Sequence, residues 1–165
     1  KLEDEIAYRD EQSSILPHFN QLFLDGTTLY LAGEIGLIAK SNDFGLSWQV
    51  FDEVYQGSFF NITRTQRGAL LIVGLRGNTF RSENNGGMWQ HIDTNTTSLL
   101  NDIVVSTNGT IIVLGNSGSV LTSVDDGRTF TLATEEDGKA LISGVFYNNQ
   151  LLVASEAGIK TITLK

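Results

Sequence analysis

The chain contains no cysteine, one proline, one methionine and two histidines among its 165 residues. Without cysteine it can form no disulfide framework, no thiolate metal site and no cysteine nucleophile. The two histidines, His18 and His91, lack the short spacing of a metal-ligand motif. No apolar run reaches 18 residues, so we expect no membrane insertion by this chain. We predict no metal and no other cofactor.

Basic residues are also scarce. Lys and Arg together number 11 against 19 Asp and Glu, which gives a net charge of −8 and a pI of about 4.6. Binding to a phosphate backbone requires clustered Lys and Arg, so nucleic acid is excluded as a partner. Length and a hydrophobic content of 41% predict a single domain over residues 1–165. The chain begins at Lys1 with neither an initiator Met nor a signal peptide, so we expect a mature or excised piece of a longer product, periplasmic or secreted.

What the sequence does have is a segment that recurs at a fixed spacing of 41 residues. Each copy holds a serine, a short acceptor side chain two residues later, a glycine two after that and an aromatic three further on. The copies are Ser41, Asp43, Gly45 and Trp48; Ser82, Asn84, Gly86 and Trp89; and Ser123, Asp125, Gly127 and Phe130. An Asp or Asn side chain closes a local turn by accepting backbone N–H groups, and glycine suits a backbone with positive φ. Because Asn84 replaces the aspartate in one copy, we interpret these residues as structural, with a buried aromatic beginning the next strand.

Between these segments the chain reads as short strands. The first repeat divides into residues 21–24, 28–32, 37–40 and 48–51, and the next two repeats divide in the same way. The runs are four or five residues long, rich in Val, Ile and Leu, and separated by Gly or Asn-Gly turns, so we predict no helix. Continuously apolar second strands such as Leu70–Val73 and Ile111–Leu114 predict sheets that are covered on both faces.

The recurring segment resembles the Asp-box, or bacterial neuraminidase repeat, found in β-propellers. The longer unit, with residues 31–40 running into the box, is most similar to the photosystem II stability/assembly factor-like family. This resemblance covers residues 20–165 and implies an all-β fold of about four 41-residue, four-stranded blades. The expected blades are residues 19–54, 58–94, 98–134 and 140–165, with residues 5–10 as an outer strand that closes the ring or belongs to a preceding blade.

The fourth repeat stops before its own box, and this leaves three alternatives for the ring. Four blades close on themselves, two copies complete a larger ring, or the chain is part of a longer propeller. Because members of the family that the chain resembles usually have more blades, we favour part of a longer propeller. An unclosed arc would leave broad apolar faces in water, which monomers rarely expose. The expected partners therefore include a second copy or the rest of a longer propeller.

In a propeller, the turns between second and third strands share one rim with the linkers that lead to the next blade. The candidate binding residues on this rim are His18, Glu34, Tyr55, Arg76, Asn116 and Glu156. A polar, chemically mixed rim suits a protein partner. The resemblance implies a non-catalytic scaffold that helps to assemble or stabilise a membrane-associated complex.

The alternative is a sialidase-like module that binds glycans or hydrolyses glycosides. By resemblance, that chemistry implies an arginine cluster, a tyrosine nucleophile and an acidic residue. The Phe-Arg-Ile-Pro signature of sialidases is absent. The arginines are too few on any one face to build a three-arginine clamp, and no spacing selects a pair of carboxylates for glycoside hydrolysis. We therefore predict no catalytic residues and no enzymatic activity.

Overall fold

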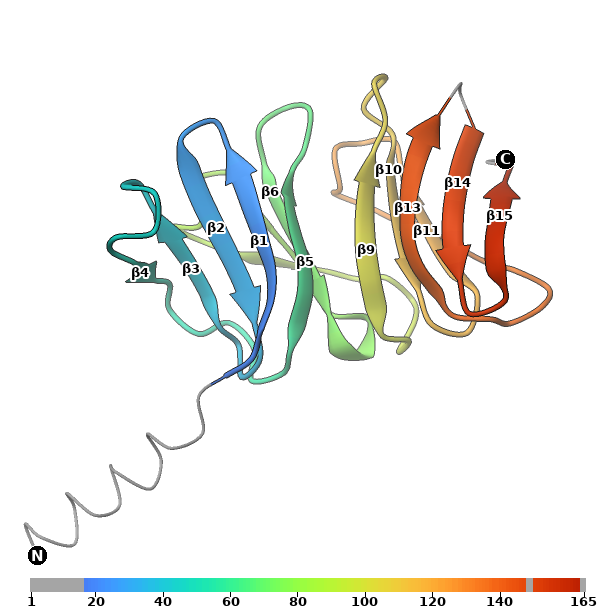
Figure 1. The fold of residues 1–165 in the computed structure, drawn as a ribbon, viewed down its shortest axis with the longest axis horizontal. Coiled ribbons are helices and arrows are strands. Elements are labelled where there is room, and N and C mark those ends of the chain that lie inside the picture. Colours follow the sequence, from blue (N-terminus) through green and yellow to red (C-terminus); the bar gives the residue numbers. More distant parts are fainter. Residues whose placement is uncertain (1–16, 148–149, 164–165) are drawn as a thin grey trace, which may run out of the picture.

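The computed structural model describes residues 17–147 and 150–163. Within these ranges the chain forms four consecutive antiparallel sheets, each a meander in which neighbouring strands pair in sequence order (Figure 1). The first sheet contains β1 (Phe19–Asp25), β2 (Thr28–Gly33), β3 (Ile38–Ser41) and β4 (Gln49–Val50); the second contains β5 (Phe59–Arg64), β6 (Leu70–Gly74), β7 (Thr79–Ser82) and β8 (Gln90–Ile92). The third contains β9 (Leu100–Val105), β10 (Ile111–Gly115), β11 (Ser119–Ser123) and β12 (Thr131–Thr134); the fourth contains β13 (Leu141–Tyr147), β14 (Gln150–Ser155) and β15 (Gly158–Ile162).

The predicted strand order is confirmed, with small differences. A three-residue 3-10 segment, η1 (Leu75–Gly77), follows β6, but Arg76 within it has a non-helical φ of 57° and ψ of 33°. It is therefore a turn, and the expectation of no helix is confirmed for the described residues. The outer strands of the first two sheets, β4 and β8, are shorter than predicted, and all three outer strands begin one residue after the aromatic of the recurring segment. The fourth sheet has three described strands, and the expected strand at residues 5–10 lies outside the described residues.

The second strand of each complete sheet lies at the centre of the core. Leu70, Val73, Ile111 and Leu114 are all fully buried, which confirms that these strands are covered on both faces. Three apolar clusters fill the spaces between the first and second, second and third, and third and fourth sheets. Each sheet therefore packs face to face against the next.

The first strands of consecutive sheets lie side by side, in the order β1, β5, β9 and β13. Each sheet then runs outward from this inner strand to its outermost strand (Figure 1). This arrangement is that of β-propeller blades. The array is open among the described residues, because the first and fourth sheets lie at its opposite ends (Figure 1).

The strand directions sort the connections onto two sides of the array. Turns between second and third strands, and linkers to the next sheet, lie on one side, which we name the turn face (lower side in Figure 1). The hairpins between first and second strands lie on the other side together with the segments Ser41–Trp48, Ser82–Trp89 and Ser123–Phe130. We name these three segments the repeat turns.

Candidate functional site

The three repeat turns share one hydrogen-bond pattern centred on a buried serine. The backbone N–H of Gly45 donates to Ser41 Oγ over 2.8 Å, and Gly86 and Gly127 donate to their serines over 2.9 Å. In turn each serine hydroxyl donates to the acceptor side chain two residues later, at 2.7 to 3.0 Å. The three glycines have φ between 78° and 88°, a left-handed conformation that costs other residues energy. These residues together fix the geometry of the turn.

The carboxylates of the first and third repeat turns are held ionised. Asp43 accepts Ser47 Oγ at 2.6 Å and Ser47 N at 2.9 Å, and these hydrogen bonds lower the pKa of Asp43 to about 2. Burial acts to raise the pKa of Asp125, but hydrogen bonds from Thr129 and Ser123 outweigh it and hold this pKa at about 2. A carboxyl group so well supplied with donors is a poor proton donor at neutral pH.

The aromatic residue of the repeat turn is buried to a different extent in each copy. Phe130 lies in the cluster between the second and third sheets and is 8% exposed. Trp89 is partly buried and meets Phe51 of the first sheet edge to face, with ring centroids 6.3 Å apart. Trp48 is 40% exposed, so the prediction of a buried ring is wrong there. The physical reason is that no sheet precedes the first one among the described residues to cover Trp48.

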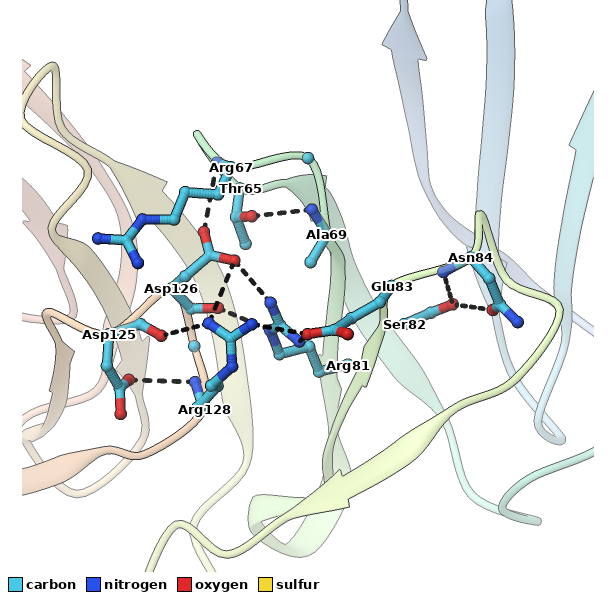
Figure 2. Close-up of polar contacts among 12 residues, drawn as sticks. Thr65, Arg67, Ala69, Arg81, Ser82, Glu83, Asn84, Asp125, Asp126 and Arg128 are labelled. Atoms are coloured by element: carbon cyan, nitrogen blue, oxygen red, sulfur yellow. Dashed lines mark hydrogen bonds and ion pairs between the residues drawn. The ribbon is translucent and has the colours of Figure 1, made fainter.

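A buried ion pair joins the second sheet to the third repeat turn (Figure 2). Arg81 on β7 donates from Nη2 to Asp126 Oδ2 at 2.6 Å and from Nε to the Asp126 carbonyl at 2.7 Å. Glu83 accepts a further bond from Arg81 Nη1 at 2.6 Å and one from Arg128 at 2.7 Å. Burial disfavours the charge on Asp126, but hydrogen bonds from Thr65 and Arg81 more than offset it, so the pKa of Asp126 is lowered. The network is engaged internally and we assign it a structural role.

The predicted rim residues are all found on the turn face, but they do different things. His18 and Glu34 form one pair, in which His18 Nδ1 lies 2.9 Å from Glu34 Oε2. Hydrogen bonds from the His18 side chain and backbone lower the pKa of Glu34. Asn116 Oδ1 accepts Asn101 Nδ2 at 3.0 Å, and Glu156 is exposed and accepts a weak bond from Ala140 N at 3.4 Å.

Tyr55 and Arg76 differ most among the six. Tyr55 is partly buried and packs against Phe59 and Phe80, with ring centroids 5.9 and 6.4 Å away. Its ring therefore packs against the second sheet while remaining partly exposed on the turn face. Arg76 is exposed at the tip of η1. The structure does not bring these residues into one cluster but distributes them along the turn face.

Sequence reasoning missed a feature of the turn tips. Ile35, Arg76 and Ser117 occupy equivalent positions 41 residues apart, and all three have φ of 54° to 57°. Positive φ is uncommon for residues other than glycine and is an outlier for a β-branched isoleucine. All three side chains are exposed. The 41-residue spacing could have shown that these three positions are equivalent, but their different side chains obscure the relationship.

Glycines connect each of these tips to the following linker. The N–H groups of Gly36, Gly77 and Gly118 donate to the carbonyls of Gly57, Ser98 and Lys139 over 2.7 to 3.0 Å. A Cβ added at Gly77 would lie 2.0 Å from the Thr96 carbonyl oxygen. The turn face is therefore a tightly bonded surface whose tip side chains are held in place.

Neither a metal site nor an arginine clamp is present in the part of the chain that the structure describes. No three His, Asp or Glu side chains there are grouped to hold a metal ion. Arg64 is paired with Asp25, Arg81 with Asp126 and Arg128 with Glu83. Among residues 17–147 and 150–163, no helix is long and apolar enough to cross a membrane.

Comparison with known proteins identifies the fold. No protein-family model matches the chain, and no curated protein matches it in sequence. Solved structures do match. YCF48 bound to a D1 peptide superposes with a TM-score of 0.66 at 18% identity, over 89% of this chain and 49% of that one. The chain thus spans about half the length of YCF48.

Two further structures show how widely the architecture occurs. An ancestral GH74 enzyme superposes with a TM-score of 0.75 at 17% identity, over 87% of this chain and 22% of the enzyme. The computationally designed Ika4 protein superposes with a TM-score of 0.70 at 13% identity, over 92% of this chain and 94% of that one. At such identities the similarity establishes the β-propeller fold alone, because one fold hosts many functions.

Proposed function

We propose that this protein is a non-catalytic β-propeller scaffold of the Asp-box type that binds a protein partner through its turn face. The observation that carries the proposal is the row of exposed tip side chains Ile35, Arg76 and Ser117, held in left-handed conformations at one spacing. Unfavourable backbone conformations are retained where the surrounding structure enforces them, often at binding surfaces. An apolar, a cationic and a hydroxyl group in fixed positions suit an extended or folded polypeptide.

The charge of the turn face indicates which kind of partner it suits. Exposed carboxylates dominate its turns and linkers: Asp52, Glu53, Asp93, Glu136, Asp137 and Glu156. Arg76 and Lys139 are the basic residues of the same segments, and Lys160 is engaged with Glu135 and Asp137. Complementary charge accelerates encounter and selects partners. We therefore propose a partner that presents a basic segment.

Two observations support a scaffold over a catalyst. The ring of Tyr55, the tyrosine on the turn face, packs against Phe59 and Phe80, which favours a packing role over that of a nucleophile. Arg76 is the single arginine on the turn face among the described residues, whereas a carboxylate clamp needs several. These two observations favour the scaffold over the sialidase-like alternative.

The finer proposal is a role like that implied by the photosystem II assembly factor-like family. YCF48 was solved with a D1 peptide bound, which shows that a protein of this architecture can bind a polypeptide. By analogy, we propose that this chain binds a segment of a protein that belongs to a membrane-associated complex. A photosynthetic role is not part of the proposal.

The test begins with affinity capture from the native organism, followed by direct binding measurements with the purified partner. Glu136→Lys on the turn face should weaken binding about tenfold, which corresponds to about 1.4 kcal/mol. The control is the double variant Met88→Lys/Val124→Lys, two exposed positions in the repeat turns, which changes the net charge equally and should bind normally. Equal weakening by both variants, or turnover of a fluorogenic sialoside by the protein, would reject the proposal.

A further inference from the structure

The array presents two open apolar faces, one at each end. The face of the first sheet turned away from the second holds a groove of about 670 Å³. Its apolar lining includes Phe19, Leu22, Leu31, Leu37, Trp48 and Val50. At the other end, the face of the fourth sheet turned away from the third holds a smaller depression of about 280 Å³, lined by the exposed Val145 and Ile159 and by the half-buried Leu152. Soluble monomers rarely leave contiguous apolar surfaces of this kind in water.

The repeat shows that the first open face has buried equivalents everywhere else. The strand registers place Phe19 in the same position as Phe59, Leu100 and Leu141. Phe19 is 68% exposed, whereas the three equivalents are fully buried against the preceding sheet. Among the described residues, no preceding sheet of the same type covers Phe19.

The second open face also has buried equivalents, which in the other sheets are covered by the following sheet. Ile159 on β15 occupies the position of Ile38, Thr79 and Val120. Ile159 is 76% exposed, whereas its three equivalents are no more than 4% exposed against the following sheet. No following sheet covers the fourth one in the part of the chain that the structure describes.

At every interface between neighbouring sheets, a face equivalent to that of Phe19 packs against a face equivalent to that of Ile159. The two open faces are therefore complementary to each other, but they lie at opposite ends of one chain (Figure 1). We propose that a second copy of this chain covers both, with the first sheet of each copy packed on the fourth sheet of the other. The result is a closed ring of eight blades with two-fold symmetry, a size within the range of known propellers.

The inner strands specify the contact that such a ring would make. Asn61 on β5 donates to Asp102 on β9 at 2.8 Å, and Asp102 accepts Ser143 Oγ on β13 at 2.9 Å. These three residues and Gln21 on β1 hold the same register position in successive sheets. In the ring, Ser143 of one copy therefore faces Gln21 of the second copy.

The first experiment is the mass of the full 165-residue chain by light scattering. We expect twice the chain mass of 18.0 kDa. Ile159→Lys should give a monomer, because it places a charge in the new interface. Leu46→Lys, at an exposed apolar position of the first repeat turn, should leave the dimer intact. A wild-type chain that has the mass of a monomer in solution would overturn the proposal.

The second experiment does not depend on a destabilising variant. In this cysteine-free chain, Gln21→Cys/Ser143→Cys should form a covalent dimer on a non-reducing gel after mild oxidation. Either cysteine alone should leave single chains, because each then faces the wild-type residue. An internal disulfide within one chain would indicate a four-bladed ring, and a ladder of larger species would indicate an open filament. Either result would reject the two-copy ring.

Discussion

The guanidinium of Arg81 lies 2.6 Å from the carboxylate of Asp126, and both side chains are 4% exposed (Figure 2). The two residues are 45 positions apart and link the second sheet to the repeat turn of the third. Breaking a buried ion pair from one side leaves an uncompensated charge, which is far more costly than the net value of the pair.

The first prediction concerns this pair. Arg81→Met and Asp126→Asn should each lower the free energy of unfolding by about 3–5 kcal/mol. Asparagine suits the left-handed backbone at position 126, where φ is 68°, so the loss will report charge rather than strain. The double variant should lose less than the sum of the single losses in urea denaturation. Strict additivity would show that the two side chains do not interact.

A second prediction concerns acid stability. Because the pKa of Asp125 is about 2 in the folded protein and about 3.9 in an unfolded chain, this residue stabilises the fold fully above about pH 4. The contribution declines as the pH falls through this range towards about 2. Asp125→Asn, which copies the natural Asn84, should reduce the loss of stability between about pH 5 and about pH 2.5 in urea titrations. An unchanged pH dependence would rule out this assignment.

A third prediction separates buried from exposed aromatics of the repeat turns. Phe130→Ala should cost about 3–5 kcal/mol, because it leaves a cavity between the second and third sheets. Phe44→Ala, at an exposed position of the first repeat turn, should cost no more than about 0.5 kcal/mol. Thermal melting of the two variants checks the difference. Similar melting temperatures would contradict the packing described for Phe130.

A fourth prediction compares Gly77, which connects a turn tip to a linker, with Gly26 in the hairpin between β1 and β2 on the opposite side of the array. Gly26 and Gly77 both have positive φ, but a Cβ at Gly26 meets no atom within 4 Å. Gly26→Ala should therefore cost only about 1–2 kcal/mol of backbone strain. Gly77→Ala should cost clearly more, because its Cβ would overlap the Thr96 carbonyl. Chemical denaturation of both variants measures the two losses in the free energy of unfolding. Equal losses would show that the linker at Thr96 moves to accommodate the new Cβ, contrary to the prediction.

Local features of the fold could be predicted from the sequence because they depend on nearby residues. The acceptor at Asp43, the glycine at Gly45 and the apolar run at Leu70–Val73 each specify their own conformation. The exposure of Trp48 could not be predicted, because it depends on a sheet that the described residues do not supply. The Arg81–Asp126 pair was hidden for another reason: the equivalents of Arg81 are Lys40 and Thr122, so the pair does not follow the repeat.

The candidate site was predicted less well than the fold. The pattern placed Glu34, Arg76 and Glu156 on the turn face, but it could not show that Glu34 is paired with His18. It also assigned Tyr55 to the rim, although its ring packs inward. The tip conformations of Ile35 and Ser117 were missed because positive φ is normally predicted only at glycine or asparagine.

The inner strands of neighbouring sheets are bonded by side chains about one repeat apart, as between Asp102 and Ser143. Because these contacts join neighbouring repeats, the chain gains stabilising contacts without first bringing together segments that are far apart in the sequence. Folding can begin wherever two adjacent repeats pack together, and neighbouring repeats can then fold onto them one after another. We therefore expect folding to start at the centre of the chain, where Arg81 meets Asp126, and to reach the first and fourth sheets last.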